Sequence, residues 1–294
     1  MHTGMDSGNS TLREISLPNG EEVPALGLGT WRYGESTSSA KAEESALRLA
    51  LEIGYRVFDS AEMYGAGGAE TVLGRALHQA LSGGIAREKL FVVSKVLPEN
   101  ASTAGVLAAC ERSLRRLQLD RIDLYLLHWR GDVPLKDTVE GFEILQQRGW
   151  IRHWGVSNFD LDDLRELHAC PGGAACSTNQ VWYSLGERGP EFELLPWQRL
   201  HQIPLMAYSP IDQGELVDHP ALHSVAQRHA ATPAQVALAW VLAQPGVMAI
   251  PKAVQGVHLR HNWQATRLQL GAADHSELDR AFAPPARKRR LAMR

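Results

Sequence analysis

Three of four short clusters that stand out in this chain carry side chains that could exchange a proton with a substrate. Asp59 and Tyr64 supply a carboxylate and a phenol. Lys95 supplies an ammonium and His128 an imidazole, and a fourth cluster, Ile-Pro-Lys, ends at Lys252. Together an acid, a phenol, an amine and an imidazole can protonate a carbonyl oxygen while a hydride reaches its carbon. The set therefore indicates nicotinamide-dependent reduction of a carbonyl group.

The phenol needs help to act as an acid at neutral pH, because its unperturbed pKa is about 10. A nearby lysine ammonium favours the phenolate and is expected to lower that pKa by roughly 1–3 units. A carboxylate would hold the lysine in place, and an imidazole would hydrogen-bond the carbonyl oxygen; such acid catalysis typically contributes about 10²- to 10⁴-fold. Taken singly, each residue has a simpler explanation. A strand-end aspartate commonly forms a cap or a salt bridge, and a loop tyrosine commonly packs.

The elements that must position these groups alternate between apolar runs and helix-period stretches. Eight runs, about 25 to 45 residues apart, are expected to be strands: residues 26–29, 56–59, 90–95, 122–128, 153–157, 178–181, 204–208 and 247–251. Apolar residues recur with a helical period over residues 42–53, and Gly54 ends that stretch. Thr232, Pro233 and Gln235 indicate the N-cap, first-turn proline and capping-box partner of a later helix.

Eight β-then-α units with continuous apolar strands imply parallel strands buried on both faces. The rival is an open doubly wound sheet, but no Gly-x-Gly-x-x-Gly turn follows the first run. An α/β fold of the (β/α)8 TIM-barrel type is therefore predicted, with the polar clusters at the carboxyl ends of its strands. Residues 14–24 are expected to form a hairpin, because Asn-Gly suits a tight turn. Residues 1–10 are expected to be a disordered tail and residues 11–294 one barrel domain.

Composition narrows the class of protein. The chain has 294 residues, of which 44% are hydrophobic and 21% charged, and its formal net charge is −3. Such a charge gives no broad field for nucleic acid or membranes. The three cysteines lack a metal-like spacing and are expected to be reduced thiols. The chain has no signal-peptide core and no apolar run of transmembrane length, so we expect a soluble cytoplasmic protein. We also expect a monomer with a small-molecule substrate and no metal.

The chain resembles the aldo-keto reductase family over nearly its whole length (about 26–284). The segments that carry the resemblance are GLGTW at 27–31, GYRVFDSAEMYG at 54–65, VSK at 93–95, DLYLLHW at 123–129, GVSNF at 155–159, NQ at 179–180, AYSP at 207–210 and IPK at 250–252. The resemblance implies a (β/α)8 barrel whose floor is closed by an N-terminal hairpin. It also implies a catalytic tetrad, with Tyr64 the general acid: Asp59, Tyr64, Lys95 and His128.

The same resemblance implies NADPH as the cofactor and assigns residues to its nicotinamide half. The matching positions are Ser157, Asn158, Gln180, Tyr208 and Ser209. Among them, Tyr208 matches the ring that stacks on the nicotinamide face. An alternative for Ser157 and Asn158 is that they cap a helix that starts near residue 160.

The phosphate end of the cofactor matches the family less closely. Lys252 matches the lysine that pairs with the 2′-phosphate of NADP, and Asn262 is retained. His258 stands where a second phosphate-binding arginine is common, and His261 where a carboxylate is common, although Arg260 is close in sequence. An ammonium at Lys252 favours NADPH over NADH by charge pairing.

The substrate side rests on tryptophans and on the end of the chain. Trp31, Trp129 and with them Trp182 match positions that build an apolar pocket over the tyrosine. Residues 283–290 are basic and are expected to be solvated, or else a weak anion site, and no long apolar loop of the steroid-binding kind follows. An open pocket for small aldehydes and 2-oxoaldehydes such as methylglyoxal is therefore expected. Residues 246–253 look most like bacterial methylglyoxal-reductase-type and 2,5-diketo-gluconate-reductase-like members.

A second hypothesis comes from another functional class. Barrels of this family also serve as NADPH-binding regulatory or sensor subunits with little turnover, and a fold does not fix a function. A pure sensor need not keep all four groups of the tetrad, so the intact tetrad favours the enzyme.

Overall fold

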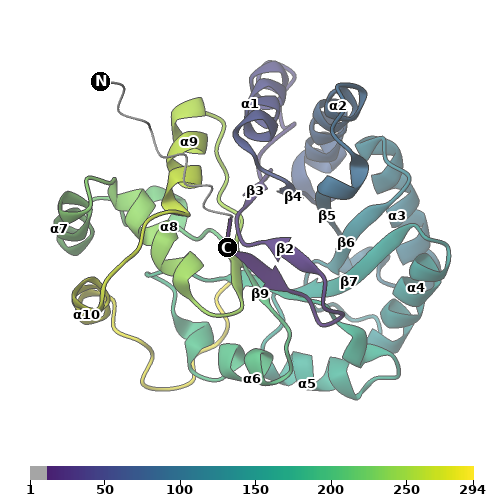
Figure 1. The fold of residues 1–294 in the computed structure, drawn as a ribbon. Coiled ribbons are helices and arrows are strands. Elements are labelled where there is room, and N and C mark those ends of the chain that lie inside the picture. The colour runs from purple at the N-terminus through teal and green to yellow at the C-terminus, as the bar shows by residue number, and fades with distance from the viewer. Residues whose placement is uncertain (1–11) are drawn as a thin grey trace.

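The computed structural model describes residues 12–294, so the expected disordered tail lies outside the described residues. The hairpin forms from β1 (Glu14–Ser16) and β2 (Glu22–Pro24), which pair antiparallel. Its turn has a left-handed backbone at Gly20, where φ is +86°, as the Asn-Gly sequence predicts. Figure 1 shows the hairpin lying across the centre of the ring of strands.

Eight parallel strands form the barrel wall, in the order in which they occur along the chain. They are β3 (Gly27–Gly29), β4 (Val57–Asp59), β5 (Phe91–Val96), β6 (Ile122–Leu127), β7 (Ile151–Ser157), β8 (Asn179–Trp182), β9 (Leu205–Tyr208) and β10 (Val247–Ala249). Parallel bridges of Leu26 to Ala249 and of Gly29 to Lys252 close the ring. The predicted (β/α)8 barrel is confirmed, and each expected run overlaps one of these strands.

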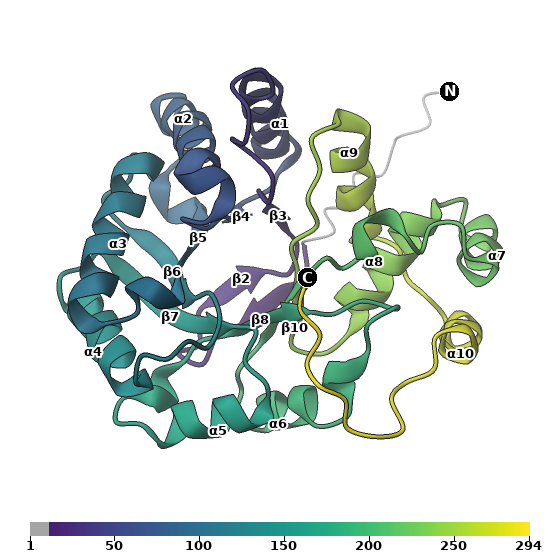
Figure 2. The same ribbon diagram turned by 180° about the vertical axis from the view of Figure 1, so that it is seen from behind.

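Helices cover the outside of the ring (Figures 1 and 2). They are α1 (Ala40–Ile53), α2 (Gly68–Ser82), α3 (Thr103–Leu117), α4 (Leu135–Gln147), α5 (Leu161–Ala169), α6 (Leu194–Leu200), α7 (Pro220–Arg228), α8 (Pro233–Ala243), α9 (Gly256–Ala265) and α10 (Ala272–Ala281). Gly54 ends α1 with a φ of +127°. Thr232 accepts a hydrogen bond from the backbone N–H of Gln235, whose side chain accepts one from the N–H of Thr232. Both predicted helix signals are confirmed.

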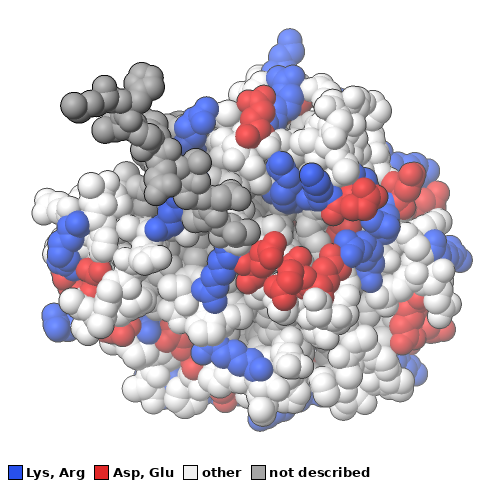
Figure 3. All heavy atoms as spheres, in the orientation of Figure 1, with Lys and Arg blue, Asp and Glu red and all other residues white. Residues whose placement is uncertain are grey.

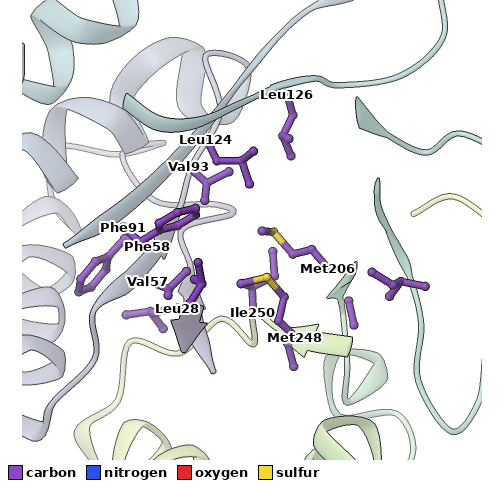
Figure 4. Packing of buried hydrophobic residues seen from close by; sticks show 14 of the residues in the cluster. Leu28, Val57, Phe58, Phe91, Val93, Leu124, Leu126, Met206, Met248 and Ile250 are labelled. Atoms are coloured by element: carbon purple, nitrogen blue, oxygen red, sulfur yellow. The ribbon is translucent and has the colours of Figure 1, made fainter. Parts of the chain in front are cut away.

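The core continues through the middle of the barrel. All residues of β5 and β6 are buried, as expected for parallel strands covered on both faces. Figure 4 shows Leu124, Leu126, Met206 and Met248 converging on the centre of the ring, and each is at most 1% exposed. The barrel is thus a packed core, which leaves space for a ligand only at its ends.

Charged side chains fasten the hairpin to the floor of the barrel, where Figure 3 shows both signs side by side. Glu21 accepts hydrogen bonds from Arg152 and from Nε2 of His153, the latter at 2.7 Å. Partial burial raises the pKa of Glu21, but these two bonds outweigh it and leave the pKa below its ordinary value. Arg152 also pairs with Asp123 at 3.4 Å. The hairpin therefore closes the floor, and the carboxyl ends of the strands form the open end.

The basic residues of 283–290 are exposed, as expected, but the segment is also attached to the barrel through Lys288. Lys288 pairs with Asp162 at 3.2 Å and with Glu193 at 2.7 Å, which ties the segment to the body of the protein. Arg287, Arg289 and Arg290 are exposed, as expected. In Figure 2 the segment runs from α10 across the open face of the barrel towards its centre.

Candidate active site

The four predicted catalytic residues meet at the open end of the barrel. Nζ of Lys95 lies 2.8 Å from each carboxylate oxygen of Asp59 and 3.3 Å from the hydroxyl of Tyr64. It also donates to the backbone carbonyl of Ser60 at 2.8 Å. The rings of Tyr64 and His128 meet edge to face, with centroids 5.7 Å apart.

The strands explain why these groups converge. Asp59 ends β4, Lys95 lies near the end of β5, and His128 follows β6 directly. Because the three strands are parallel neighbours, their carboxyl ends deliver the side chains to one place.

Tyr64 reaches the same place through a tight turn. It begins the short helix η1 (Tyr64–Gly67), in which Gly65, Ala66 and Gly67 have φ values of +56°, +52° and +89°. A Cβ at Gly65 would lie 2.8 Å from the carbonyl oxygen of Tyr33, so this position favours glycine on two grounds. Glu62 fixes the loop to the end of β5 by accepting a hydrogen bond from the backbone N–H of Leu97 at 2.8 Å.

Burial decides the protonation state of the site. Loss of solvent raises the pKa of Tyr64 well above its ordinary value, and the negative charge of Asp59 raises it further. Loss of solvent lowers the pKa of Lys95, against the attraction of Asp59. It lowers the pKa of His128 well below its ordinary value, and the charge of Lys95 acts in the same direction. At neutral pH the phenol and the imidazole are therefore both neutral.

The expectation that Lys95 would lower the pKa of Tyr64 is wrong for this structure. The ammonium is closer to Asp59 than to the phenol, so most of its charge is compensated by the carboxylate. The remaining attraction is too small to offset the burial of the phenol and its repulsion by Asp59. Tyr64 thus keeps its proton until a reaction takes it.

The residues assigned to the nicotinamide half form a hydrogen-bonded chain beside the tetrad. The hydroxyl of Tyr208 donates to Oδ1 of Asn158 at 2.9 Å. The amide of Asn158 donates to the carbonyl of His128 and to Oγ of Ser157, both at 3.1 Å. The alternative capping role does not apply, because Asp160 itself caps α5 by accepting from two backbone N–H groups. Asn158 has a left-handed backbone, with a φ of +58°.

Gln180 contacts the tetrad directly, which the sequence did not predict. Its Nε2 donates to Oδ1 of Asp59 at 2.8 Å. Asp59 therefore accepts bonds from both Lys95 and Gln180, and the amide oxygen of Gln180 is left to accept from a ligand. The only sequence signal is that a glutamine occupies the middle of a buried strand.

One cavity of about 570 Å³ joins the tetrad to the predicted phosphate end. Its lining includes every residue assigned to the site except Lys95, which lies beneath, and Trp129: Trp31, Asp59, Tyr64, His128, Ser157, Asn158, Gln180, Tyr208, Ser209, Lys252 and Asn262. His258 and His261 also line it, whereas Arg260, the guanidinium close in sequence, does not. The volume lies within the range of small-molecule and cofactor pockets.

The three tryptophans lie in different places. Trp31 lines the cavity. The ring of Trp129 packs against that of His128 with centroids 4.9 Å apart, and Trp129 is not among the lining residues. Trp182 donates from Nε1 to Asp212 at 2.6 Å, behind the cavity wall. The structure therefore brings only Trp31 directly onto the cavity.

Several lining residues had no signal in the sequence. The main ones are Arg32, Met63, Ile211, Gln213, Val217 and Arg294. Arg32 has a left-handed φ of +65° and stacks its guanidinium 4.3 Å from the ring of Trp31. Such backbone outliers recur at functional sites, but they become visible only in a structure.

Within residues 12–294, the side chains support neither a metal centre nor a cysteine nucleophile. No group of three or more metal-ligating side chains comes together there. Burial raises the pKa of the Cys110 and Cys176 thiols to about 12, so neither is a thiolate nucleophile. None of the described helices is both long and apolar enough to cross a membrane.

Comparisons with known proteins agree with this geometry. A model of the aldo/keto reductase family matches residues 25–283. The methylglyoxal reductase YeaE of Escherichia coli K12 is 47% identical, over 95% of this chain and 98% of that relative. The glyoxal reductase of Bacillus subtilis is 37% identical, over 90% and 91% of the two chains. A crystal structure of an aldo/keto reductase from Klebsiella pneumoniae with NADP and acetate is 44% identical, with a TM-score of 0.91 over 96% of this chain and 100% of that one. The chain belongs to the aldo/keto reductase family.

Proposed function

We propose that this protein is an NADPH-dependent reductase that converts small aldehydes and 2-oxoaldehydes, such as methylglyoxal, to alcohols. The observation that carries the proposal is the convergence of a neutral phenol, an ammonium held by a carboxylate, and a neutral imidazole in one cavity. Relatives that are methylglyoxal and glyoxal reductases support the substrate class.

The chain's own residues handle the proton. Tyr64 donates its hydroxyl proton to the carbonyl oxygen, and Lys95, 3.3 Å away, stabilises the phenolate that remains. Asp59 keeps Lys95 oriented. The neutral imidazole of His128, edge to face with the phenol, hydrogen-bonds the carbonyl oxygen and orients it. NADPH, when bound, supplies the hydride.

The cavity fits such a cofactor at both ends. Near the tetrad, Ser157, Asn158 and Gln180 would hold the carboxamide, and the ring of Tyr208 with the adjacent Ser209 would form the platform beneath the nicotinamide. A flat aromatic wall and convergent amides are what a planar carboxamide-bearing ring requires.

At the far end of the cavity, Lys252 would pair with the 2′-phosphate and Asn262 would contact the adenosine portion. Asn262 is 4% exposed and lines the cavity. Its side-chain amide offers both a donor and an acceptor to a bound adenosine, so this end of the cavity fits the cofactor.

Lys252 provides a test of the cofactor preference. In Lys252→Met, KM for NADPH should rise by about tenfold while KM for NADH changes little, because only the phosphate-bearing cofactor loses a charge pair. Steady-state kinetics with both cofactors measures the ratio. An unchanged ratio would remove Lys252 from this role.

A substrate panel tests the reaction itself. With NADPH and purified protein, kcat/KM should be higher for methylglyoxal and benzaldehyde than for a steroid ketone, because the cavity of about 570 Å³ also has to hold the cofactor, and the methylglyoxal and glyoxal reductases among the relatives support small substrates. A steroid preferred over methylglyoxal would overturn the proposed substrate class. Tight NADPH binding without turnover of any aldehyde would instead support the regulatory or sensor subunit.

We also propose that residues 11–294 act as one barrel domain in a cytoplasmic monomer without a nucleic-acid partner. The three cysteines are all unpaired, which suits a reducing compartment. Light scattering after size-exclusion chromatography measures the molar mass; a mass of two or more chains would contradict the monomer.

A further inference from the structure

A buried ion pair lies behind the barrel wall, between β5 and the helices that cover it. The carboxylate of Glu70, in the first turn of α2, is 0% exposed and accepts a hydrogen bond from Nε of Arg116 in α3 at 2.6 Å. It also accepts one from Oγ of Ser94 in β5 at 2.5 Å. None of these three residues lines the cavity, so the cluster lies outside the site described above.

Ser94 links this ion pair to the lysine of the tetrad. Ser94 and Lys95 are consecutive in β5, and neighbouring residues of a strand point to opposite faces of the sheet. The side chain of Lys95 points into the open end of the barrel, where it reaches Tyr64. Ser94 therefore points outwards, to the helices. Its bond to Glu70 thus fixes the strand at the residue next to Lys95.

Arg116 links the same ion pair to the turn that carries Tyr64. That turn ends at Gly67, where φ is +89°. A Cβ at Gly67 would lie 2.6 Å from Cδ and 2.7 Å from Nε of Arg116, so the arginine packs directly against the turn. Glu70 lies in the helical turn that follows. The ion pair therefore holds the end of the Tyr64 turn against α3.

The charge of Glu70 also acts on Lys95. Burial lowers the pKa of Lys95; the charge of Asp59 opposes this shift, and the charge of Glu70 opposes it further from the other face of β5. Burial raises the pKa of the Cys110 thiol to about 12 and the pKa of Tyr125 well above its ordinary value, and Glu70 adds to both shifts. Both groups are therefore neutral. Glu70 thus acts on the lysine by its charge as well as through the strand.

The proton donor and its lysine come from separate elements. Tyr64 begins η1 and Lys95 lies in β5, and their polar atoms are 3.3 Å apart. This distance depends on whatever joins the two elements, and Glu70 contacts both sides through Ser94 and Arg116. A small misplacement of reacting groups costs a large factor in rate.

We infer that Glu70 is a positioning residue that fixes Lys95 and the Tyr64 turn at their reacting distance from behind the barrel wall. The inference rests on the proposed function. Arg116 supplies the cation that compensates the buried carboxylate. Glu70 acts through Ser94 and through the start of α2, and it touches neither the substrate nor the cofactor.

Replacing Glu70 by glutamine keeps the shape of the side chain and removes its charge. In Glu70→Gln, kcat for the reduction of methylglyoxal by NADPH should fall about tenfold. The KM for methylglyoxal and the Kd for NADPH should stay within about twofold of the wild type, because Glu70 does not line the cavity. An unchanged kcat, or an effect confined to KM or Kd, would overturn the inference.

The pH profile separates this role from a general loss of stability. The charge of Glu70 raises the pKa of Lys95, so its removal lowers that pKa. The alkaline limb of kcat, where Lys95 loses its proton, should therefore move to lower pH in Glu70→Gln. An alkaline limb that coincides with that of the wild type would show that Glu70 only stabilises the fold, and would refute the inference.

Ser94→Ala tests the link to β5 by itself. The variant keeps the ion pair and removes only the hydroxyl that donates to Glu70, so it should fold even if Glu70→Gln does not. Its kcat should fall by a smaller factor than in Glu70→Gln, and the alkaline limb should stay where the wild type has it. A kcat equal to that of the wild type would contradict the proposed link.

Asp274→Asn is the matched control. Asp274 is also a buried carboxylate, 6% exposed, and pairs with Arg228 at 2.8 Å. It joins α10 to α7, on the side of the ring opposite to α2 and α3 (Figures 1 and 2). Asp274→Asn should lower the melting temperature but keep the wild-type kcat and pH profile. An equal loss of kcat in Asp274→Asn and Glu70→Gln would overturn the inference, because any destabilised variant would then behave alike.

A further test needs neither cofactor nor substrate. In Glu70→Gln without ligand, amide hydrogen exchange in residues 60–67 should become several-fold faster than in the wild type, because the Tyr64 turn loses a charged contact to α3. Exchange in the same residues of Asp274→Asn should match the wild type. Equal exchange in Glu70→Gln and the wild type would overturn the positioning role, whatever the protein binds.

Failure of the proposed function gives a different pattern. Wild-type protein that turns over no aldehyde with NADPH would refute the proposed function, and the exchange experiment would still report on the turn. Turnover by the wild type, with the same kcat and pH profile in Glu70→Gln, would leave the proposed function intact and refute only the role of Glu70.

Discussion

Replacing Lys95 by methionine should destabilise the protein as well as impair its activity. Lys95 is 0% and Asp59 2% exposed, so the variant leaves a buried carboxylate whose remaining side-chain donor is Nε2 of Gln180. Breaking a buried pair by removing one partner typically costs about 3–5 kcal/mol. At about 2–4 °C per kcal/mol, the melting temperature should fall by roughly 6–20 °C.

The double variant Lys95→Met/Asp59→Asn separates charge from packing. It removes the uncompensated carboxylate, so it should be more stable than Lys95→Met alone. Arg115→Met serves as the control, because Arg115 pairs with Glu111 at 3.8 Å on the surface and both side chains are more than half exposed. It should lie within about 0.5 kcal/mol of the wild type.

Urea unfolding at pH 7, with calorimetry for the melting temperature, measures these differences. The reasoning is refuted if the free energy of unfolding of Lys95→Met lies within about 1 kcal/mol of the wild-type value, since burying a carboxylate without its cation should cost more than that. A double variant less stable than Lys95→Met would equally contradict it.

Two further predictions concern His128 and Gln180. The pKa of His128 is depressed in the folded protein. Below about pH 6.5 the imidazole therefore gains a proton in the unfolded chain but not in the folded site, so the free energy of unfolding of the wild type should decrease as the pH falls. The decrease reaches up to about 2 kcal/mol at pH 5. Urea unfolding of His128→Asn over pH 5 to 7 should show a smaller decline, and an identical decline would show that His128 is not the titrating group. In Gln180→Leu, which removes the donor to Asp59, kcat should fall by roughly tenfold and NADPH binding should weaken. Weaker binding with an unchanged kcat would restrict Gln180 to cofactor contact.

The fold and the meeting of Asp59, Tyr64, Lys95 and His128 at one rim were predictable because they depend on local patterns that the barrel geometry then combines. Polar residues at the ends of buried runs, such as Asp59 and Lys95, can be found in the sequence, and parallel strands place them at one rim. The caps at Gly54 and Thr232 depend only on residues within one turn. Such features do not require knowledge of distant contacts.

The contacts that escaped prediction all join distant parts of the chain or depend on burial. Gln180 reaches Asp59 across the closed barrel, 121 positions away in sequence. Arg294 reaches Tyr208 only because residues 283–294 fold back over the rim of the barrel. The pKa of Tyr64 depends on its burial and on the charge of Asp59, and the sequence identifies these groups without the distances between them.

The most direct test of the central claim compares NADPH consumption with methylglyoxal in the wild type and in Tyr64→Phe. The phenylalanine keeps the ring and removes only the hydroxyl that lies 3.3 Å from Lys95. We expect the wild type to turn over and the variant to lose about 10²- to 10⁴-fold in kcat, with NADPH affinity retained. Equal turnover in both proteins would contradict the assignment of Tyr64 as the proton donor.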